Sequence, residues 1–211
     1  MSESIEHKPK KVIIIGASGH ARVIADIIKC SGDEVQGFLD DRNPDAFPGL
    51  RVLGHIADAV ALQADDVWFV LGIGKNATRE KIAQELGKLR YYTAIHPSAI
   101  IADDVIIDEG TVVMANAVVN TGSSIGRHCI INTSATVDHD NRIADFVHLS
   151  PGVHLSGTVK IGEGTWLGTG AVVSNNVNIC GDCTVGAGGV VITRIHEPGT
   201  YVGIPVRKVK S

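Results

Sequence analysis

Aromatic side chains are scarce in this sequence, since phenylalanine, tryptophan and tyrosine together make up 4% of its residues. Apolar residues still account for 44%, which is enough for a sizeable core, so that core is expected to be mainly aliphatic. Strong positive charge is also missing. The formal net charge is −4, which gives no electrostatic basis for binding nucleic acid.

The sequence has no long apolar run near the N-terminus. The apolar stretch there is short and covers Val12 to Gly16. It is too short for the core of a signal peptide or for a membrane span. We therefore expect a cytoplasmic protein without membrane insertion, whose four cysteines are reduced. Cys180-Gly-Asp-Cys183 resembles half of a zinc knuckle, but no second pair follows it, so no metal site is predicted.

What the second half of the chain does have is a ladder of aliphatic residues spaced six apart. The ladder residues are Ile101, Ile107, Val113, Val119, Ile125, Ile131, Val137, Ile143, Leu149, Leu155, Ile161, Leu167, Val173, Ile179, Val185 and Val191. Residues six apart point in different directions on an α-helix, so this spacing excludes a helix. A fixed period without insertions is typical of a solenoid.

Six residues suit a short strand followed by a turn, and three such units close a triangular coil whose aliphatic residues point inward. The sixteen hexads then build a prism of a little over five coils. Small or β-branched residues two positions before each ladder residue fit a narrow interior. Gly126, Gly162, Gly168 and Gly186 follow ladder residues directly, and we expect unusual backbone angles there, at the corners.

Residues 11–95 show a different pattern, in which apolar strands alternate with helical segments. Strands are expected at 11–15, 35–39, 51–53, 67–73 and 90–95, and helices at 21–30, 56–62 and 76–87, the last capped by Asn76. This alternation predicts a small parallel sheet of Rossmann type. The chain is therefore divided into an α/β domain at 1–95, with a proline-rich loop at 41–50, and a β-helix at 96–211 whose tail leaves the prism as a loop.

Three loops of the N-terminal domain follow predicted strands and so meet at one edge of the sheet: Gly16–His20, Asp40-Asp41 and Gly72–Asn76. A glycine turn before a helix lets backbone N–H groups approach phosphate, and acids at a strand end accept hydrogen bonds from ribose or base. The turn is not a complete dinucleotide fingerprint, and alone it also fits a structural turn. Together the three loops favour a nucleotide-type ligand.

His139 is the main candidate for catalysis, because it stands between Asp138 and Asp140 and two positions past the inward Val137. It should therefore lie at an outward corner of the prism. A carboxylate beside a histidine orients the ring and raises its basicity, as a general base requires. An ordinary surface histidine is the alternative from the residues alone. Cys129 is predicted to point inward and is a poor nucleophile.

The chain resembles the NeuD/PglD-type family of hexapeptide-repeat sugar acetyltransferases. The similar motifs are Gly16-Ala-Ser-Gly-His20, Phe38-Leu-Asp-Asp41, Ile73-Gly74, Asn132-Thr-Ser-x3-Asp-His139-Asp140 and Gly203-Ile-Pro205. The family joins a Rossmann-like N-terminal domain to a left-handed parallel β-helix and forms trimers. It includes sialic acid O-acetyltransferases and nucleotide-4-aminosugar N-acetyltransferases of bacterial glycan biosynthesis.

The resemblance also implies roles for particular residues. His139 matches the general base, and Asp140 stands where the family often has a longer glutamate. The nucleotide-sugar pocket is matched by Ser18, Gly19, His20, Asp40, Asp41 and Gly74. The positions that contact acetyl-CoA are matched by His148, Thr169 and Ala187, the last two of which depart from the expected residue types.

The function implied by this resemblance is acetyl transfer from acetyl-CoA to the 4-amino group of a UDP- or dTDP-linked 4-amino-6-deoxy sugar, without a metal. O-acetylation of sialic acid or a related sugar is the first alternative. A zinc enzyme like γ-carbonic anhydrase would need three histidines to converge, and His139, His148 and His154 are available. A scaffold that binds nucleotide sugars without catalysis is the third alternative.

Overall fold

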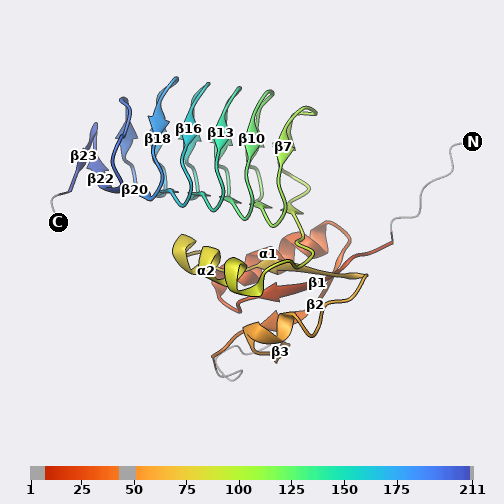
Figure 1. Ribbon diagram of the computed structural model, residues 1–211. Coiled ribbons are helices and arrows are strands. Elements are labelled where there is room, and N and C mark those ends of the chain that lie inside the picture. The colour runs from red at the N-terminus through yellow and green to blue at the C-terminus, as the bar shows by residue number, and fades with distance from the viewer. Residues whose placement is uncertain (1–7, 43–50, 210–211) are drawn as a thin grey trace, which may run out of the picture.

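The computed structural model describes residues 8–42 and 51–209. Most of the predicted proline-rich loop at 41–50 lies outside the described residues. Figure 1 shows the two parts of the chain, a small α/β domain and a prism of stacked coils that lies alongside it. No helix among the described residues is long and apolar enough to cross a membrane.

The N-terminal domain is built on sheet A, which consists of four parallel strands in the order β3-β2-β1-β4. Its elements are β1 (Lys11–Ile15), α1 (Gly19–Cys30), β2 (Glu34–Leu39), β3 (Val52–Gly54), the 3₁₀ turn η2 (Ile56–Ala59), β4 (Val67–Leu71) and α2 (Asn76–Leu86). Alternate residues of β1 face opposite ways, so Ile14 packs with α1 while Ile15 packs with the side chains of α2. This confirms the predicted Rossmann-like unit.

Three local predictions in this domain were wrong. The helix expected at 56–62 is only the 3₁₀ turn η2, and the strand expected at 90–95 shrinks to β5 (Ala94–Ile95), preceded by a single bridge from Tyr91 to Phe69. Asn76 does not cap α2, because Lys75 holds the cap position. The Asn76 amide instead donates to the backbone oxygens of Gly164 and Thr165 in the prism.

The prism consists of three parallel sheets, which we name B, C and D. Sheet B contains β5, β8 (Val112–Val113), β11 (Ile130–Ile131), β14 (His148–Leu149), β17 (Trp166–Leu167) and β20 (Cys183–Val185). Sheet C contains β6 (Ile100–Ile101), β9 (Val118–Val119), β12 (Thr136–Val137), β15 (His154–Leu155), β18 (Val172–Val173) and β21 (Val190–Val191). Sheet D contains β7 (Ile106–Ile107), β10 (Ser124–Ile125), β13 (Arg142–Ile143), β16 (Lys160–Ile161) and β19 (Asn178–Ile179).

The aliphatic ladder forms the prism core, as predicted. Every ladder residue belongs to one hydrophobic cluster, and all except Ile101 and Ile107 in the first coil are buried. With six strands in sheet C and five in sheet D, the prism has between five and six coils. One further inward residue, Ile195, follows the ladder and bridges to Ile179 after a shortened last coil.

The expected corner glycines turned out to serve a different purpose. None of Gly126, Gly162, Gly168 and Gly186 has a positive φ. They allow close packing between coils, since a Cβ on Gly168 would lie only 2.7 Å from the backbone nitrogen of Ala187. The left-handed conformation falls three residues after each ladder residue from Ile107 to Val185, at positions held by Gly, Asn, Asp, His, Ser, Thr or Phe.

The tail after the prism is not the predicted loop. Strand β22 (Gly199–Gly203) pairs in parallel with β20, and β23 (Val206–Lys208) pairs antiparallel with β22, so both extend sheet B. These two strands also close the C-terminal end of the core, because Tyr201 of β22 and Val206 of β23 pack against the ladder cluster.

The N-terminal domain packs against the outer face of sheet B. Val112, Met114 and Ile130 of this face join the buried cluster formed by α1 and sheet A. Apolar burial of this kind holds two domains in one orientation more firmly than a flexible linker does. The edge of sheet A where the predicted nucleotide loops meet is therefore held at a defined level of the prism.

Candidate functional site

The glycine turn after β1 is held in place by Asp40. One carboxylate oxygen of Asp40 accepts from the backbone N–H of Ala17 at 2.8 Å, and both oxygens accept from the Arg42 guanidinium at 2.9 Å. The guanidinium lowers the pKa of the Asp40 carboxyl to about 2. The sequence predicted a direct ligand contact for Asp40, but in this structure its oxygens bind the protein's own turn.

Asp41, its neighbour, has a different environment. Its side chain is exposed and accepts from the backbone N–H of Ile56 at 2.9 Å, at the start of η2. The two aspartates therefore differ in their partners and in their exposure, although the same role was predicted for both from the sequence. Asp40 holds the glycine turn, and Asp41 is the one whose exposed carboxylate is open to a ligand.

The remaining predicted nucleotide-sugar residues come together at one place. Ser18 donates to the backbone oxygen of Gly72 at 3.2 Å, which joins the loops after β1 and β4. Gly19 and Gly74 flank this junction, and a Cβ added to either would meet no atom within 4 Å. There is therefore open space beside the first turn of α1 at Gly19, and a helix N-terminus with such space beside it can bind an anionic group.

His20 of α1 and His148 of β14 lie near each other across the domain boundary. Burial lowers the pKa of His20 to about 4 and that of His148 to about 3, and the positive charge of Arg79 makes a smaller contribution in the same direction. Both rings are therefore neutral at pH 7. His148 is contacted at Nε2 by the Asn132 amide at 3.2 Å. One nitrogen of each histidine, His20 Nε2 and His148 Nδ1, has no partner among the described residues.

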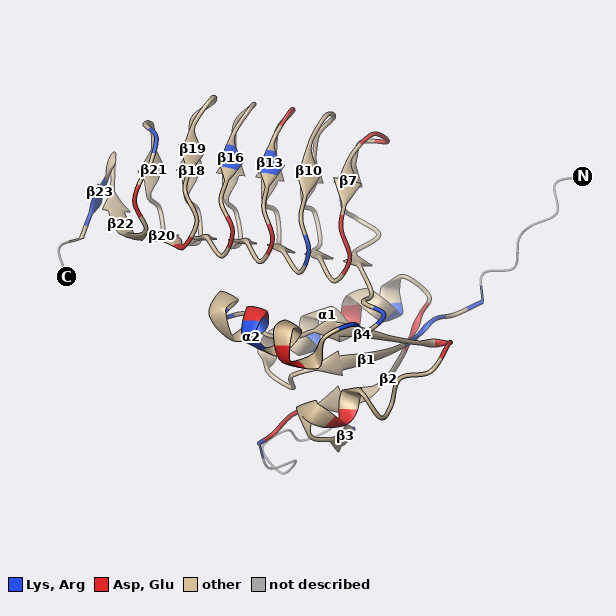
Figure 2. Cartoon of the chain, in the orientation of Figure 1, with Lys and Arg blue, Asp and Glu red and all other residues tan. Residues whose placement is uncertain are grey.

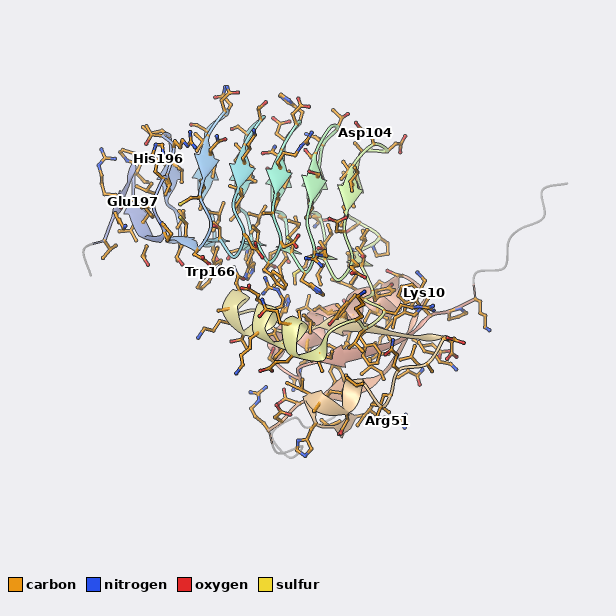
Figure 3. All side chains as sticks on the ribbon, viewed as in Figure 1. Lys10, Arg51, Asp104, Trp166, His196 and Glu197 are labelled. Atoms are coloured by element: carbon orange, nitrogen blue, oxygen red, sulfur yellow. The ribbon has the colours of Figure 1, made fainter. Side chains whose placement is uncertain are left out.

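Trp166 extends this junction toward the C-terminal end of the prism. Its ring stacks on that of His148 with centroids 6.0 Å apart, and its Nε1 donates to the Ser150 hydroxyl at 2.8 Å. Trp166 is 46% exposed and lies on the side of the prism that faces α2 (Figure 3). A cavity of about 660 Å³ beside it is lined by Gly74 and the start of α2.

His139 lies at the corner between sheets C and D, as predicted, and its side chain is 53% exposed. Its Nδ1 lies 2.8 Å from a carboxylate oxygen of Asp140. This hydrogen bond raises the pKa of the His139 imidazole. Since a protonated Nδ1 donates to Asp140, the other ring nitrogen, Nε2, is left to accept a proton.

The coils above and below leave room for this pair. A Cβ on Gly157 would lie 2.5 Å from His139 Nε2, and one on Gly122 would lie 2.5 Å from an Asp140 oxygen. Asp138, on the other side of His139, accepts from the backbone N–H of His139 and from the Asn120 amide. Neither glycine nor Asn120 was identified from the sequence. The 18-residue period of the coils could have indicated them, because Gly157, Gly122 and Asn120 lie one coil away from His139, Asp140 and Asp138, respectively.

Thr169 and Ala187 lie on a different corner from His139. Both are exposed where sheet B turns into sheet C, on successive coils joined near this point by the hydrogen bond from Gly188 to Thr169. Within one chain, the structure therefore does not bring these two predicted coenzyme contacts to His139. It also separates His139 from the nucleotide loops, which lie against sheet B.

Arg79 is a residue that the sequence did not indicate at all. It is 1% exposed, and its guanidinium donates to five acceptors on both domains. These are the backbone oxygens of His128, Phe146, Ile73 and Gly74 and the side-chain oxygen of Asn76. Arg79 thus ties the loop containing Gly74 to the prism.

The cysteines and histidines do not form a metal site among the described residues. His139 lies at a corner, His148 on sheet B and His154 on sheet C, so these three diverge within one chain. Cys129 points inward as predicted, and burial raises the pKa of its thiol to about 12, which makes it unreactive.

The chain is similar to known proteins in both sequence and fold. Residues 11–86 match the family model of the PglD N-terminal domain. UDP-N-acetylbacillosamine N-acetyltransferase of Bacillus subtilis is 39% identical over 112 residues, which are 50% of this chain and 52% of that enzyme. The chain thus matches only about half the length of that curated relative.

Solved structures match over nearly the whole chain. The acetyltransferase domain of PglB from Neisseria gonorrhoeae, in complex with acetyl coenzyme A, is 36% identical with a TM-score of 0.90, covering 96% of this chain and 100% of that one. PerB from Caulobacter crescentus, in complex with CoA and GDP-perosamine, is 36% identical with a TM-score of 0.88, covering 95% and 97%. The chain therefore belongs to the PglD-type family of hexapeptide-repeat sugar acetyltransferases.

Proposed function

We propose that this protein transfers the acetyl group of acetyl-CoA to the 4-amino group of a nucleotide-linked sugar in bacterial glycan biosynthesis. The observation that carries the proposal is the His139–Asp140 pair, held at 2.8 Å on the prism of a chain that also has an open nucleotide-type cleft. The similar enzymes act, by name, on UDP-N-acetylbacillosamine and GDP-perosamine. O-acetylation of sialic acid would leave this nucleotide-type cleft unexplained.

The chemistry follows from the orientation of His139. Its Nε2 removes a proton from the amine as the nitrogen attacks the thioester carbonyl, a C–N bond forms, and the C–S bond breaks. The proton then passes from His139 to the departing CoA thiolate. Hydrogen bonding to Asp140 stabilises the imidazolium between these two steps, and no covalent acyl-enzyme is needed.

The separation of the sites within one chain supports a homotrimer. The outward residues of sheet C are Ile100, Val118, Thr136, His154, Val172 and Val190, and four of these six are aliphatic. Ile100 is 66% exposed, so this face is an apolar surface without a partner in the single chain. We propose that copies pack around a three-fold axis along sheet C.

Such packing would also complete the active site. Sheet C is bounded by the corner of His139 on one side and by the corner of Thr169 and Ala187 on the other. Around a three-fold axis, the first corner of one copy meets the second corner of the next. His139 would then face the coenzyme contacts and the nucleotide cleft of its neighbour, in which Ser18, Gly19 and Gly74 bind the nucleotide.

We keep the division into a nucleotide-sugar-binding domain at 1–95 and an acetyltransferase domain at 96–211 as part of this proposal. A cytoplasmic location also remains a prediction. The test of the activity is an acetyl-CoA-dependent assay with UDP-, dTDP- and GDP-linked 4-amino-6-deoxy sugars. Acetylation of one of these amines is expected. Turnover of sialic acid alone would overturn the proposal in favour of O-acetylation.

Mixing two inactive variants tests the shared site. His139→Ala removes the base, and Gly74→Trp fills the cleft, so each homotrimer should be inactive. Unfolding and refolding the two together should restore activity to a fraction of the mixed trimers, because some interfaces combine an intact base with an intact cleft. If the site lies within one chain, the mixture remains inactive.

A further inference from the structure

The outward face of sheet D carries a row of cations in an otherwise acidic chain. The strand register places Arg142 beside Lys160 and Lys160 beside Asn178, and the bridge from Ile179 to Ile195 brings Arg194 next in line. Figure 2 shows the positive charge on β13 and β16. The whole chain has a net charge of −4, so this concentration of positive charge is not the average character of its surface.

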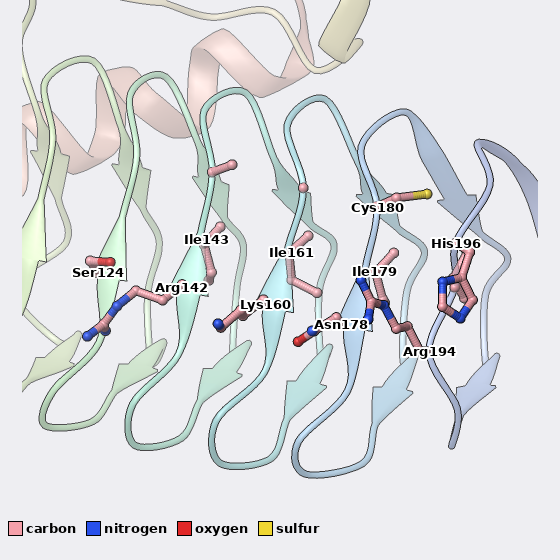
Figure 4. A pocket seen from close by; sticks show the side chains of 13 residues that line it. Ser124, Arg142, Ile143, Lys160, Ile161, Asn178, Ile179, Cys180, Arg194 and His196 are labelled. Atoms are coloured by element: carbon pink, nitrogen blue, oxygen red, sulfur yellow. The ribbon is translucent and has the colours of Figure 1, made fainter.

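These cations line one hollow of about 410 Å³ (Figure 4). Its lining includes Arg142, Lys160, Arg194 and His196 but no aspartate or glutamate. None of the three permanent cations is within ion-pair distance of a carboxylate among the described residues, in contrast to Arg127, which pairs with Asp145 at 2.8 Å. Charges arranged in this way attract an anion to the groove.

We propose that this cationic row binds the phosphate groups of the coenzyme, a polyanionic adenosine nucleotide, while the thioester lies at His139. The inference rests on the proposed function, because it takes its starting point from the acetyl transfer at His139. Arg142 follows His139 by three residues in the same coil, and the row then runs toward the C-terminal end. At about 4.8 Å between paired strands, Arg194 lies roughly 14 Å along the prism from Arg142.

The position of the row favours the coenzyme over the nucleotide sugar. Hydrogen bonds and apolar contacts of the N-terminal domain with the prism extend from Asp108 to Thr165. The hollow continues past them to Arg194 and His196 in the last coil. A nucleotide held at Gly19 and Gly74 would lie near the level of His148. Thr169 and Ala187, the predicted coenzyme contacts of a neighbouring copy, also lie on C-terminal coils.

The experiment measures CoA binding directly, by calorimetry without any acceptor sugar. Lys160→Gln and Arg194→Gln are each expected to weaken CoA binding by roughly threefold to fivefold, as an exposed charge pair does. The double variant should lose about tenfold or more, and its affinity should depend less on salt. Lys81→Gln, a charge on the exposed surface of α2, is the matched control and should bind CoA like the parent protein.

Dephospho-CoA, which lacks the 3′-phosphate, shows which phosphate is bound. Loss of the difference between CoA and dephospho-CoA in the double variant assigns the row to the 3′-phosphate, and equal weakening of both ligands assigns it to the diphosphate. Unchanged CoA binding in the double variant overturns the inference, as does an effect confined to the KM of the nucleotide sugar. Because no sugar enters the binding measurement, its outcome does not depend on whether any sugar is acetylated.

Discussion

His139 Nδ1 and a carboxylate oxygen of Asp140 lie 2.8 Å apart, although the two residues are neighbours in the chain. Adjacent side chains on a strand point to opposite faces, so this contact depends on the turn. Asp140 has φ +59°, one of the left-handed positions that recur at the corners of the prism. The repeat therefore places the acid beside the base through backbone geometry.

The first prediction concerns the base itself. His139→Asn should lower kcat by about 10²–10⁴-fold, the usual contribution of a general base, with little change in thermal stability because the side chain is exposed. Steady-state kinetics and a thermal melt check both parts. Full activity in this variant would exclude His139 from the mechanism.

The second prediction concerns pH. Asp140 raises the pKa of His139, and only the neutral ring accepts a proton, so the rate should fall as the pH drops through that raised pKa. Asp140→Asn removes the charge while asparagine still tolerates the left-handed backbone. The acid limb of the kcat/KM profile should move to lower pH, and the plateau should fall because the base is weaker. An acid limb that stays in place would contradict this coupling.

The third prediction concerns the space around the imidazole. In Gly157→Ala, the new Cβ would lie 2.5 Å from His139 Nε2, so the ring must shift. A displacement of this size should lower kcat by roughly 10-fold to 100-fold while CoA binding is kept. Asn175→Ala, at the same corner one coil further on, is the control and should retain activity. Equal loss in both variants would indicate a general effect on the corner.

The fourth prediction concerns the connection between the domains. Arg79→Met would leave five acceptors without their donor in a buried place, and the free energy of unfolding should fall by roughly 3 kcal/mol. Chemical denaturation measures this loss. Arg22→Met on the exposed face of α1 should change stability by less than about 0.5 kcal/mol. The KM for the nucleotide sugar should also rise in the Arg79 variant, because the Gly74 loop loses its tie to the prism.

The fifth prediction concerns metal. The proposed proton transfers use only His139 and Asp140, so dialysis against a chelator should leave kcat unchanged. Elemental analysis of the dialysed protein measures how much metal remains bound to it. If activity disappears and returns with zinc, histidines from different copies must converge on a metal after all.

How much the sequence could predict differs between the two domains. In the prism, each coil repeats the last, so the ladder register alone places His139 outward at a corner and Cys129 inward. In the N-terminal domain, strand periodicity located sheet A, but it could not show that Asp40 binds Arg42 and Ala17 while Asp41 stays exposed. Those partners depend on how loops meet, and loop residues carry no period.

By itself, the sequence determined the fold of the prism and its inward and outward positions, because these follow from a local repeat. Only the tertiary structure decided which distant residues meet. It buried Arg79 between the domains, with acceptors on both, and it packed the N-terminal domain against sheet B, away from the corner of His139. These contacts join residues far apart in the chain, so packing between coils and domains, and not local preference, fixes them.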